Sequence, residues 1–210
     1  MIALIDYGGG NVGSVLKAIE YLGASAKIVD RPEDLAAASK IILPGQGHLG
    51  SMMKALRGRG MIGPLREIVS ASATAATGSG SVLPAKYYLG ICLGLQALYA
   101  GSEEAPGIPG FGLLAGQVTR FDGSLKVPHV GWSQLETSRD STVLRGVETG
   151  SFVYYCHSYY GPATDETVAT TDYGQRFAAA AEVGRAWAVQ FHPEKSGGVG
   201  LRVLRNFLEA

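Results

Sequence analysis

Two short apolar runs flank a helical pattern near the N-terminus, and this order constrains the fold more than any other feature. Residues 2–7 (IALIDY) are typical of a strand, and residues 12–22 carry apolar side chains at helical spacing. Asn11 is placed to cap this helix. Further strand candidates follow at 26–29 and 40–43. The strand–helix–strand order predicts a parallel sheet covered by helices.

The second half of the chain has a different pattern. Short apolar runs alternate with turn residues from about 111 to 191, which favours several strands, some of them antiparallel. Between the halves, 87–91 indicates a strand and 92–101 a helix, and 199–208 predicts a terminal helix. We therefore predict an α/β fold with a mostly parallel central sheet flanked by helices and additional antiparallel strands in the second half.

A stretch of small residues, SASATAATGSGS, begins at Ser70 and separates a glycine-broken helical region from the next strand. It contains no charge and no large apolar side chain, which is typical of a surface loop or a frayed helix end. The strand pattern resumes directly after it. We predict one domain over 1–210, with 70–86 as a surface insertion.

Charge and cysteine content exclude several classes of protein. Lys and Arg number 18, as do Asp and Glu, so the formal net charge is zero and nucleic-acid binding by counterion release is not expected. No run approaches the ~18 apolar residues of a membrane span, and the N-terminus lacks the basic region of a signal peptide. Two cysteines make no disulfide framework, and no histidine pair has helical zinc spacing. We expect a cytoplasmic protein without metal or cofactor.

The pentapeptide GICLG places Cys92 between a strand and a helix, with glycines two residues to either side. A nucleophile on such a sharp turn exposes its side chain, and the next backbone N–H can donate to an oxyanion. A buried structural cysteine is the alternative, because free cysteine is common in cores. Cys156, in an apolar strand without such glycines, is predicted to be structural.

His192 and Glu194 follow the last predicted strand, in the sequence HPE. A nucleophilic cysteine needs a base, and the base needs an acceptor that orients it. Two residues apart on an extended chain, the two side chains point to the same side. A strand-end histidine beside a solvated glutamate is the alternative, but its co-occurrence with the Cys92 turn favours a Cys-His-Glu triad.

Two glycine-rich loops follow predicted strands. Residues 44–47 (PGQG) can turn backbone N–H groups toward a developing negative charge. Residues 8–13 (GGGNVG) fit the dinucleotide fingerprint, with Asp30 about twenty residues further on. A dinucleotide-binding module is therefore a rival hypothesis, although such a module needs neither the Cys92 turn nor the HPE sequence.

Taken together, these segments resemble the triad (class I) glutamine amidotransferases, and among them the glutaminase subunits of imidazole glycerol phosphate synthase in histidine biosynthesis. The resemblance covers nearly the whole chain and rests on DYGGGN at 6–11, LPGQG at 43–47, GICLGLQ at 90–96, PHVGW at 128–132, HSYY at 157–160 and QFHPEKSG at 190–197. It implies that Cys92 attacks the side-chain amide of L-glutamine, with His192 as base and Glu194 as its orienting group.

The resemblance also implies a glutamine pocket and a partner. The pocket positions are Gly45, Gly47, Leu93, Gln96, Glu104, His157, Ser158 and Tyr159. Ammonia would pass to a (β/α)₈ cyclase subunit in a heterodimer, which makes imidazole glycerol phosphate and aminoimidazole carboxamide ribotide. The interface positions are Asn11, Trp132, Tyr154 and Lys195.

The chain departs from the family pattern at two places. Gln46 stands where the family usually has an apolar residue, so the amide of the 44–47 loop that completes the oxyanion hole is undecided. The 70–86 segment is longer than usual. A subunit that feeds another synthase, such as an anthranilate-type one, is the nearest alternative function.

Overall fold

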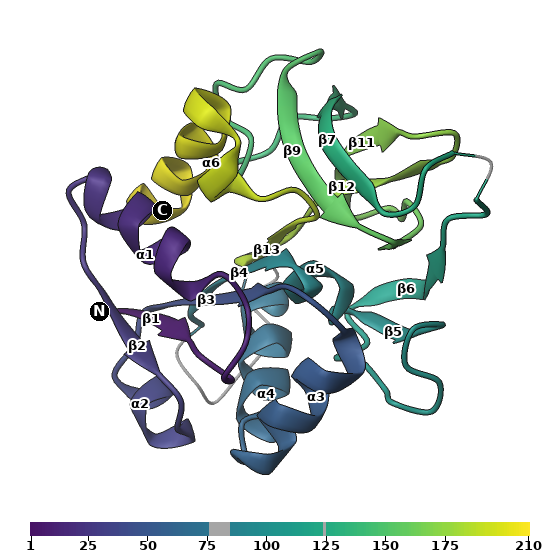
Figure 1. Cartoon of the computed structure of the whole chain (residues 1–210). Helices are drawn as coiled ribbons and strands as arrows, with labels where there is room; N and C mark the ends of the chain where they lie inside the picture. Colours follow the sequence, from purple (N-terminus) through teal and green to yellow (C-terminus); the bar gives the residue numbers. More distant parts are fainter. Residues whose placement is uncertain (76–84, 124) are drawn as a thin grey trace.

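A mixed sheet of eight strands lies at the centre of the computed structural model, which describes residues 1–75, 85–123 and 125–210 (Figure 1). Its strand order is β2-β1-β3-β4-β13-β12-β11-β8. The parallel part comprises β2 (Ala26–Val29), β1 (Ile2–Ile5), β3 (Lys40–Gly45), β4 (Tyr87–Cys92) and β13 (Ala186–Val189). The antiparallel part comprises β12 (Arg176–Val183), β11 (Thr167–Asp172) and β8 (Glu136–Thr137). The predicted α/β class is confirmed.

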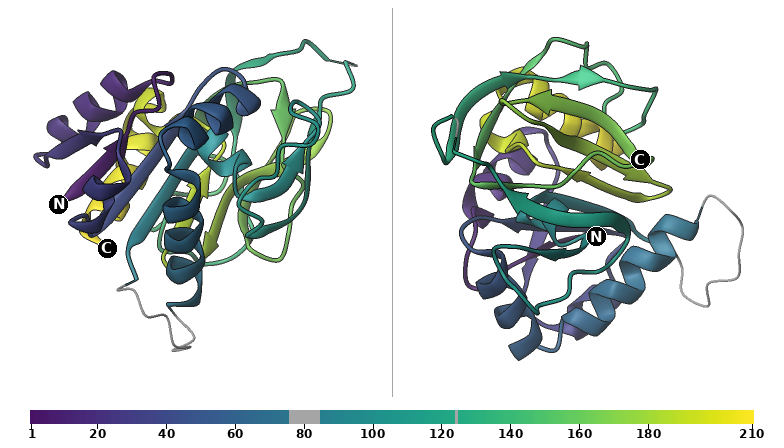
Figure 2. Two further views of the ribbon diagram at one scale, coloured as in Figure 1. Left: turned by 90° about the horizontal axis from the view of Figure 1, so that it is seen from below. Right: turned by 90° about the vertical axis from the view of Figure 1, so that its right-hand side faces the viewer.

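Helices cover both faces of this sheet (Figures 1 and 2). One face packs against α1 (Val12–Tyr21) and α6 (Gly197–Glu209), and the other against α2 (Pro32–Ala36), α3 (Leu49–Gly58) and α4 (Ile62–Thr74).

Alternate residues of each strand supply the two cores, as the period of two in a strand requires. On β3, Ile42 joins the α1 and α6 side, whereas Ile41 and Leu43 join the α3 and α4 side. The inner strands β3 and β4 are therefore buried on both faces after their first residue, whereas the edge strand β2 keeps Lys27 and Ile28 exposed.

Two smaller sheets extend the second half. One contains β5 (Tyr99–Ser102), β6 (Leu114–Arg120) and β10 (Tyr159–Tyr160), and the other pairs β7 (His129–Gln134) with β9 (Phe152–His157). The helix expected over 92–101 was wrong beyond its first turn, because α5 spans only Leu93–Gln96. After α5 the backbone carbonyl groups accept hydrogen bonds from the 110–114 segment instead of continuing the helix. Phe111 N–H donates to the Ala97 carbonyl at 2.6 Å, and β5 pairs with β6.

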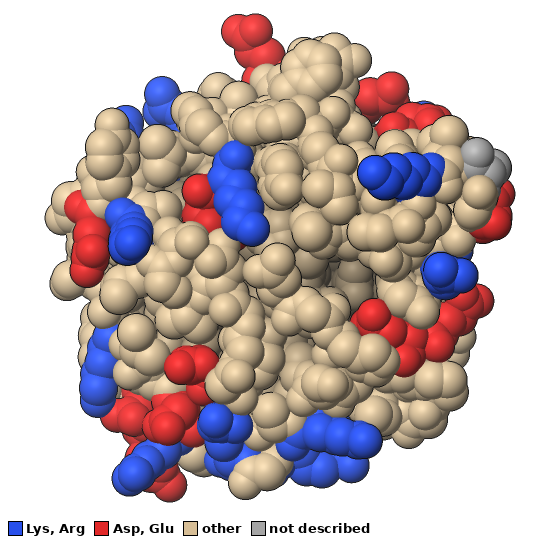
Figure 3. Space-filling model, in the orientation of Figure 1, with Lys and Arg blue, Asp and Glu red and all other residues tan. Residues whose placement is uncertain are grey.

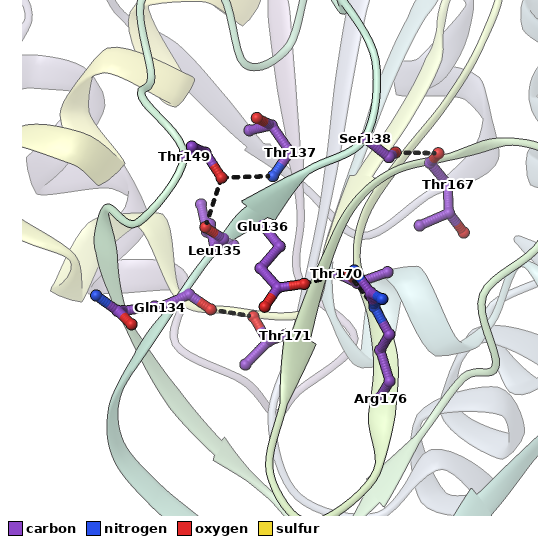
Figure 4. A network of polar contacts seen from close by, with 10 residues as sticks. All are labelled: Gln134, Leu135, Glu136, Thr137, Ser138, Thr149, Thr167, Thr170, Thr171 and Arg176. Atoms are coloured by element: carbon purple, nitrogen blue, oxygen red, sulfur yellow. Dashed lines mark hydrogen bonds and ion pairs between the residues drawn. The ribbon is translucent and has the colours of Figure 1, made fainter.

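A polar network joins the antiparallel strands (Figure 4). Arg176 on β12 contacts Glu136 on β8, and its Nε donates to Thr170 Oγ1 on β11 at 2.9 Å. Thr171 Oγ1 donates to the Gln134 carbonyl at the end of β7, at 2.8 Å. The network thereby links the β7–β9 ribbon to the central sheet.

Three neighbouring strands, β3, β4 and β13, end at the same edge of the sheet. Gly45 of β3 is in register with Cys92 of β4, and Val189 of β13 is in register with Ile91. The carboxyl ends of parallel strands are where ligands bind in such sheets. The fold therefore brings the 44–47 loop, Cys92 and the residues after β13 together.

The predicted insertion is described only at its ends. Residues 70–74 belong to α4, and 76–84 lie outside the described residues. Within the described ranges, no helix has both the length and the apolar character needed to cross a bilayer.

Candidate active site

Cys92 ends strand β4 in a strained backbone conformation. Its φ of 55° and ψ of −102° make it the single non-glycine residue with positive φ among those described. A Cβ on Gly90 would lie 2.5 Å from the Gly94 carbonyl oxygen, and one on Gly94 would lie 2.1 Å from the Leu43 carbonyl oxygen. Backbone strain of this kind costs about 1–3 kcal/mol and is typical of functional sites. The glycines allow β4, α5 and β3 to approach closely enough to hold the turn.

We predict that Gly94→Ala destabilises the protein by about 3 kcal/mol or more, because the new methyl group meets backbone that cannot move aside. Gly63→Ala is the matched control: Gly63 lies in helix α4 with nothing within 4 Å of the added methyl. It should stabilise the protein by about 0.5–1 kcal/mol. Urea unfolding of both variants checks the pair, and equal midpoints would contradict the proposed backbone clash.

His192 and Glu194 form a buried pair next to β13. His192 Nδ1 lies 2.8 Å from Glu194 Oε1, and their side chains are 1% and 0% exposed. The alternative of a solvated glutamate was therefore wrong. The extended geometry expected for HPE was also wrong, because Pro193–Lys195 form a short 3₁₀ helix, η1. Proline is favoured in the first turn of a helix, and this turn carries Glu194 back to the imidazole.

Opposing effects set the pKa values of this pair. Burial alone would lower the pKa of His192, but its interactions with Cys92 and Glu194 outweigh burial and raise the pKa above 6.5. Burial would raise the pKa of Glu194. The hydrogen bond from His192, the positive charge of His192 and the hydrogen bond from Asn11 outweigh burial and hold that pKa below 4.5. An ionised carboxylate therefore fixes the proton on Nδ1 and leaves Nε2 for exchange with the Cys92 sulfur.

The side chain of Asn11 does not cap helix α1 as the sequence predicted. Instead, Asn11 Nδ2 donates to Glu194 Oε1 at 2.9 Å, across 183 residues of sequence. One carboxylate oxygen thus accepts from both Asn11 and His192, which orients the carboxylate within the triad.

A cavity of about 230 Å³ opens beside Cys92. Seven of the eight predicted glutamine-binding residues line it: Gly47, Leu93, Gln96, Glu104, His157, Ser158 and Tyr159. Gln46, Pro128 and Cys156 complete the wall. The eighth, Gly45, is not in the lining. A Cβ there would lie 2.5 Å from Leu93 Cβ, so Gly45 instead lets Leu93 pack against β3. A larger hollow of about 610 Å³ along residues 100–109 contains no triad residue.

Two side chains in the cavity wall are held by the backbone. Glu104 Oε2 accepts from the Leu49 N–H at 2.6 Å, which fixes its carboxylate at the start of α3. His157 Nδ1 lies 2.8 Å from the Tyr159 carbonyl, and a carbonyl only accepts, so Nδ1 carries the proton. Burial lowers the pKa of His157 to about 3. The neutral ring presents an acceptor at Nε2, which has no hydrogen bond among the described residues.

The 44–47 loop contacts the first glycine loop through Tyr7. Gln46 N–H donates to the Tyr7 hydroxyl at 3.2 Å, and a Cβ on Gly9 would lie 2.9 Å from the Tyr7 ring. In this structure the Gln46 amide is therefore engaged by Tyr7. Gly9 and Gly10 of the first glycine loop therefore leave room for the Tyr7 ring beside the 44–47 loop.

Three of the four predicted interface residues cluster on the β7–β9 ribbon and η1. Trp132 is 53% exposed, its ring meets that of Tyr154 edge-on at 6.0 Å, and Lys195 Nζ lies 5.8 Å from the Tyr154 ring centre. Val130 and Phe152 are also 53% exposed and share this face of the ribbon, because paired and alternate residues point the same way. Sequence reasoning missed Val130 and Phe152.

Sequence reasoning also missed Tyr7 and Gln190. Gln190 is fully buried, and its Nε2 lies 3.5 Å from Cys92 Sγ. A signal was present, because Gln190 and His192 are two residues apart at the end of a predicted strand and so share a side. Tyr7 gave no comparable signal.

Comparison with known proteins identifies the family. Residues 3–210 match the family model described as glutamine amidotransferase class-I. The chain is 47% identical to the imidazole glycerol phosphate synthase subunit HisH of Methanothermobacter thermautotrophicus, over 100% of this chain and 98% of that protein. It is 43% identical to the subunit of the same name from Deinococcus radiodurans, over 98% of this chain and 92% of the relative.

Solved structures agree on the fold. A crystal structure of a glutamine amidotransferase superposes with a TM-score of 0.72 at 21% identity, covering 100% of this chain and 98% of the other. The dinucleotide-binding hypothesis has no counterpart among these relatives. The chain belongs to the class-I glutamine amidotransferases, within the family of HisH subunits of imidazole glycerol phosphate synthase.

Proposed function

We propose that this protein hydrolyses L-glutamine to glutamate and ammonia through Cys92, His192 and Glu194, and delivers the ammonia to a cyclase subunit. The observation that carries the proposal is the position of Cys92, strained at the end of β4, beside the buried His192–Glu194 pair that follows the neighbouring strand β13. Membership of the glutamine amidotransferases supports glutamine as the substrate. The name of the relatives supports imidazole glycerol phosphate synthase as the complex.

The reaction follows from this geometry. The Cys92 thiolate attacks the amide carbon of the glutamine side chain, and the Leu93 N–H, directly after the nucleophile, stabilises the oxyanion. His192 donates its Nε2 proton to the leaving nitrogen, the C–N bond breaks and ammonia departs. His192 then removes a proton from water, which attacks the thioester. The C–S bond breaks, glutamate leaves and the thiolate is regenerated.

The glutamine molecule would occupy the cavity beside Cys92. The cavity volume of about 230 Å³ is several times the ~30 Å³ that one molecule occupies in liquid water, so the cavity can hold an amino acid. Glu104 supplies a carboxylate for the α-ammonium, and Gln96 and the neutral His157 supply acceptors within the wall. Gly47, Ser158 and Tyr159 complete the polar lining.

The ribbon face of Val130, Trp132, Phe152 and Tyr154 is the proposed cyclase interface. Exposed apolar groups gathered on one face mark protein contacts. Cys156 pairs with Val130 on the ribbon and also lines the cavity, so the substrate site borders this face. Figure 3 shows most charged groups around the rim of the view, and a hollow near its centre that is bordered mostly by uncharged atoms, with acidic atoms at its lower right.

Glutamate release tests the proposed function directly. The chain alone should hydrolyse glutamine poorly, and addition of the cyclase with its nucleotide ligand should raise the rate. Strong hydrolysis without the partner would contradict the coupling. Stimulation by an anthranilate-type synthase instead would assign the chain to that alternative.

We predict that Trp132→Ala raises the Kd for the cyclase about 30-fold or more, because central exposed tryptophans at interfaces contribute about 2 kcal/mol or more. Tyr21→Ala is the matched control, since Tyr21 is an aromatic residue with 78% exposure at the far end of α1. Titration by calorimetry measures both variants. A Trp132→Ala affinity equal to that of Tyr21→Ala would place the interface elsewhere.

The proposed location is the cytoplasm. Both cysteines are free, and the mechanism needs Cys92 as a thiol, which reducing compartments maintain.

A further inference from the structure

Gln190 connects the nucleophile to the wall of the cavity. It follows β13, is fully buried and lies two residues before His192. Its Nε2 is 3.5 Å from Cys92 Sγ, and its Oε1 is 3.2 Å from Gln96 Nε2. These three side chains come from β4, α5 and the end of β13, so the contact spans neighbouring strands.

The chemistry of the neighbours fixes which end of the Gln190 amide faces the sulfur. Gln96 Nε2 also donates to the Tyr159 carbonyl at 2.8 Å, so it is a donor toward Gln190 as well. The Gln190 side chain therefore accepts this hydrogen bond with its oxygen, and its NH₂ group points to Cys92. The opposite orientation would set two NH₂ groups against each other and an oxygen against a thiolate.

Gln96 has one group left for a ligand. Its Oε1 is buried and has no hydrogen-bond partner within the part of the chain that the structure describes, and Gln96 lines the cavity with Cys92. A buried acceptor without a partner is costly, so a molecule that donates to it binds favourably. A donor bound there is linked through two side-chain amides to the sulfur.

We propose that Gln190 is a further residue of the catalytic centre: it donates its side-chain amide to the Cys92 thiolate and holds the sulfur in place relative to a substrate bound against Gln96. The proposal rests on the proposed function, in which Cys92 is the nucleophile. Hydrogen bonds to charged groups contribute more than neutral ones, so the contact stabilises the thiolate before it attacks. Gln190 itself stays outside the cavity lining, so its loss affects the chemical step more than substrate binding.

Gln190→Met tests the proposal, because methionine keeps most of the volume and removes the donor. The assay is alkylation of Cys92 by iodoacetamide at fixed pH, in a Cys156→Ala background so that one thiol reacts, with the cyclase complex assayed in parallel. We expect alkylation and kcat to fall about ten- to a hundredfold and KM to change less than about threefold. Gln190→Asn keeps the amide but is one methylene too short to reach the sulfur, so it should show the same loss.

Asn206→Leu is the matched control. Asn206 is another buried amide, 1% exposed, which donates to the Val143 and Arg145 carbonyls away from the site. Its loss should lower stability and leave the alkylation rate unchanged. Wild-type alkylation in folded Gln190→Met or Gln190→Asn overturns this proposal alone. Glutamine hydrolysis by Cys92→Ala would instead overturn the proposed function.

Discussion

Cys92→Ala should lower glutamine hydrolysis by the cyclase complex about 10⁴-fold or more, because it removes the sulfur that forms the thioester in the proposed mechanism. Alanine fits the site sterically, since it only removes the sulfur from a side chain that is 2% exposed. The measurement is glutamate release with the cyclase and its nucleotide ligand present. The complex should still form and should still use added ammonia, which separates loss of chemistry from loss of folding or docking.

Hydrolysis within a few fold of wild type would refute the assignment of Cys92. In that case Cys156, the other cysteine in the cavity wall, would be the next candidate. We expect the opposite, since Cys156 lies within strand β9 and lacks the strained turn that exposes Cys92.

Glu194→Gln should lower kcat about 10²–10⁴-fold, by analogy with amide replacement of the carboxylate in serine protease triads. Glu194 Oε1 accepts from both His192 Nδ1 and Asn11 Nδ2, so a neutral amide cannot stabilise the imidazolium and can place the proton on the wrong nitrogen. The pKa of His192 should fall, because the interaction with Glu194 contributes to raising it. Activity plotted against pH, with KM measured at each point, checks both effects.

The same variant predicts a stability difference with a defined pH window. The pKa of Glu194 is lowered in the folded state. Its contribution to the free energy of unfolding is therefore present above pH 4.5 and is lost as the pH falls through the folded-state pKa. The pKa of His192 is raised in the folded state. Its contribution to the free energy of unfolding is therefore complete below pH 6.5 and is lost as the pH rises through the folded-state pKa. Wild type and Glu194→Gln should therefore differ most between about pH 4.5 and 6.5 in urea unfolding. A difference that is constant with pH would show that the pair is not charged.

Local physics explains which elements could be predicted. The strands at 26–29 and 40–43 and the helix after Asn11 were recognisable because apolar periodicity follows from burial on one or both faces. The prediction of a helix over 92–101 was wrong because the carbonyl groups of its second half accept hydrogen bonds from the 110–114 segment. No local sequence pattern indicates that contact. Pro193 explains the other local error, since it begins a 3₁₀ turn where an extended chain was expected.

The sequence by itself determined the chemistry: a cysteine between two glycines, a histidine with a glutamate two residues on, and strands that place each motif at a carboxyl end. Only the tertiary structure decided which strands are neighbours, since β4 and β13 pair although nearly a hundred residues separate them. It also turned Asn11 to Glu194 and Gln190 to Cys92, and exposed Val130 and Phe152 beside Trp132. The physical reason is that residue types and spacing fix local conformation and reactivity, whereas long-range hydrogen bonds and burial depend on how the whole sheet packs.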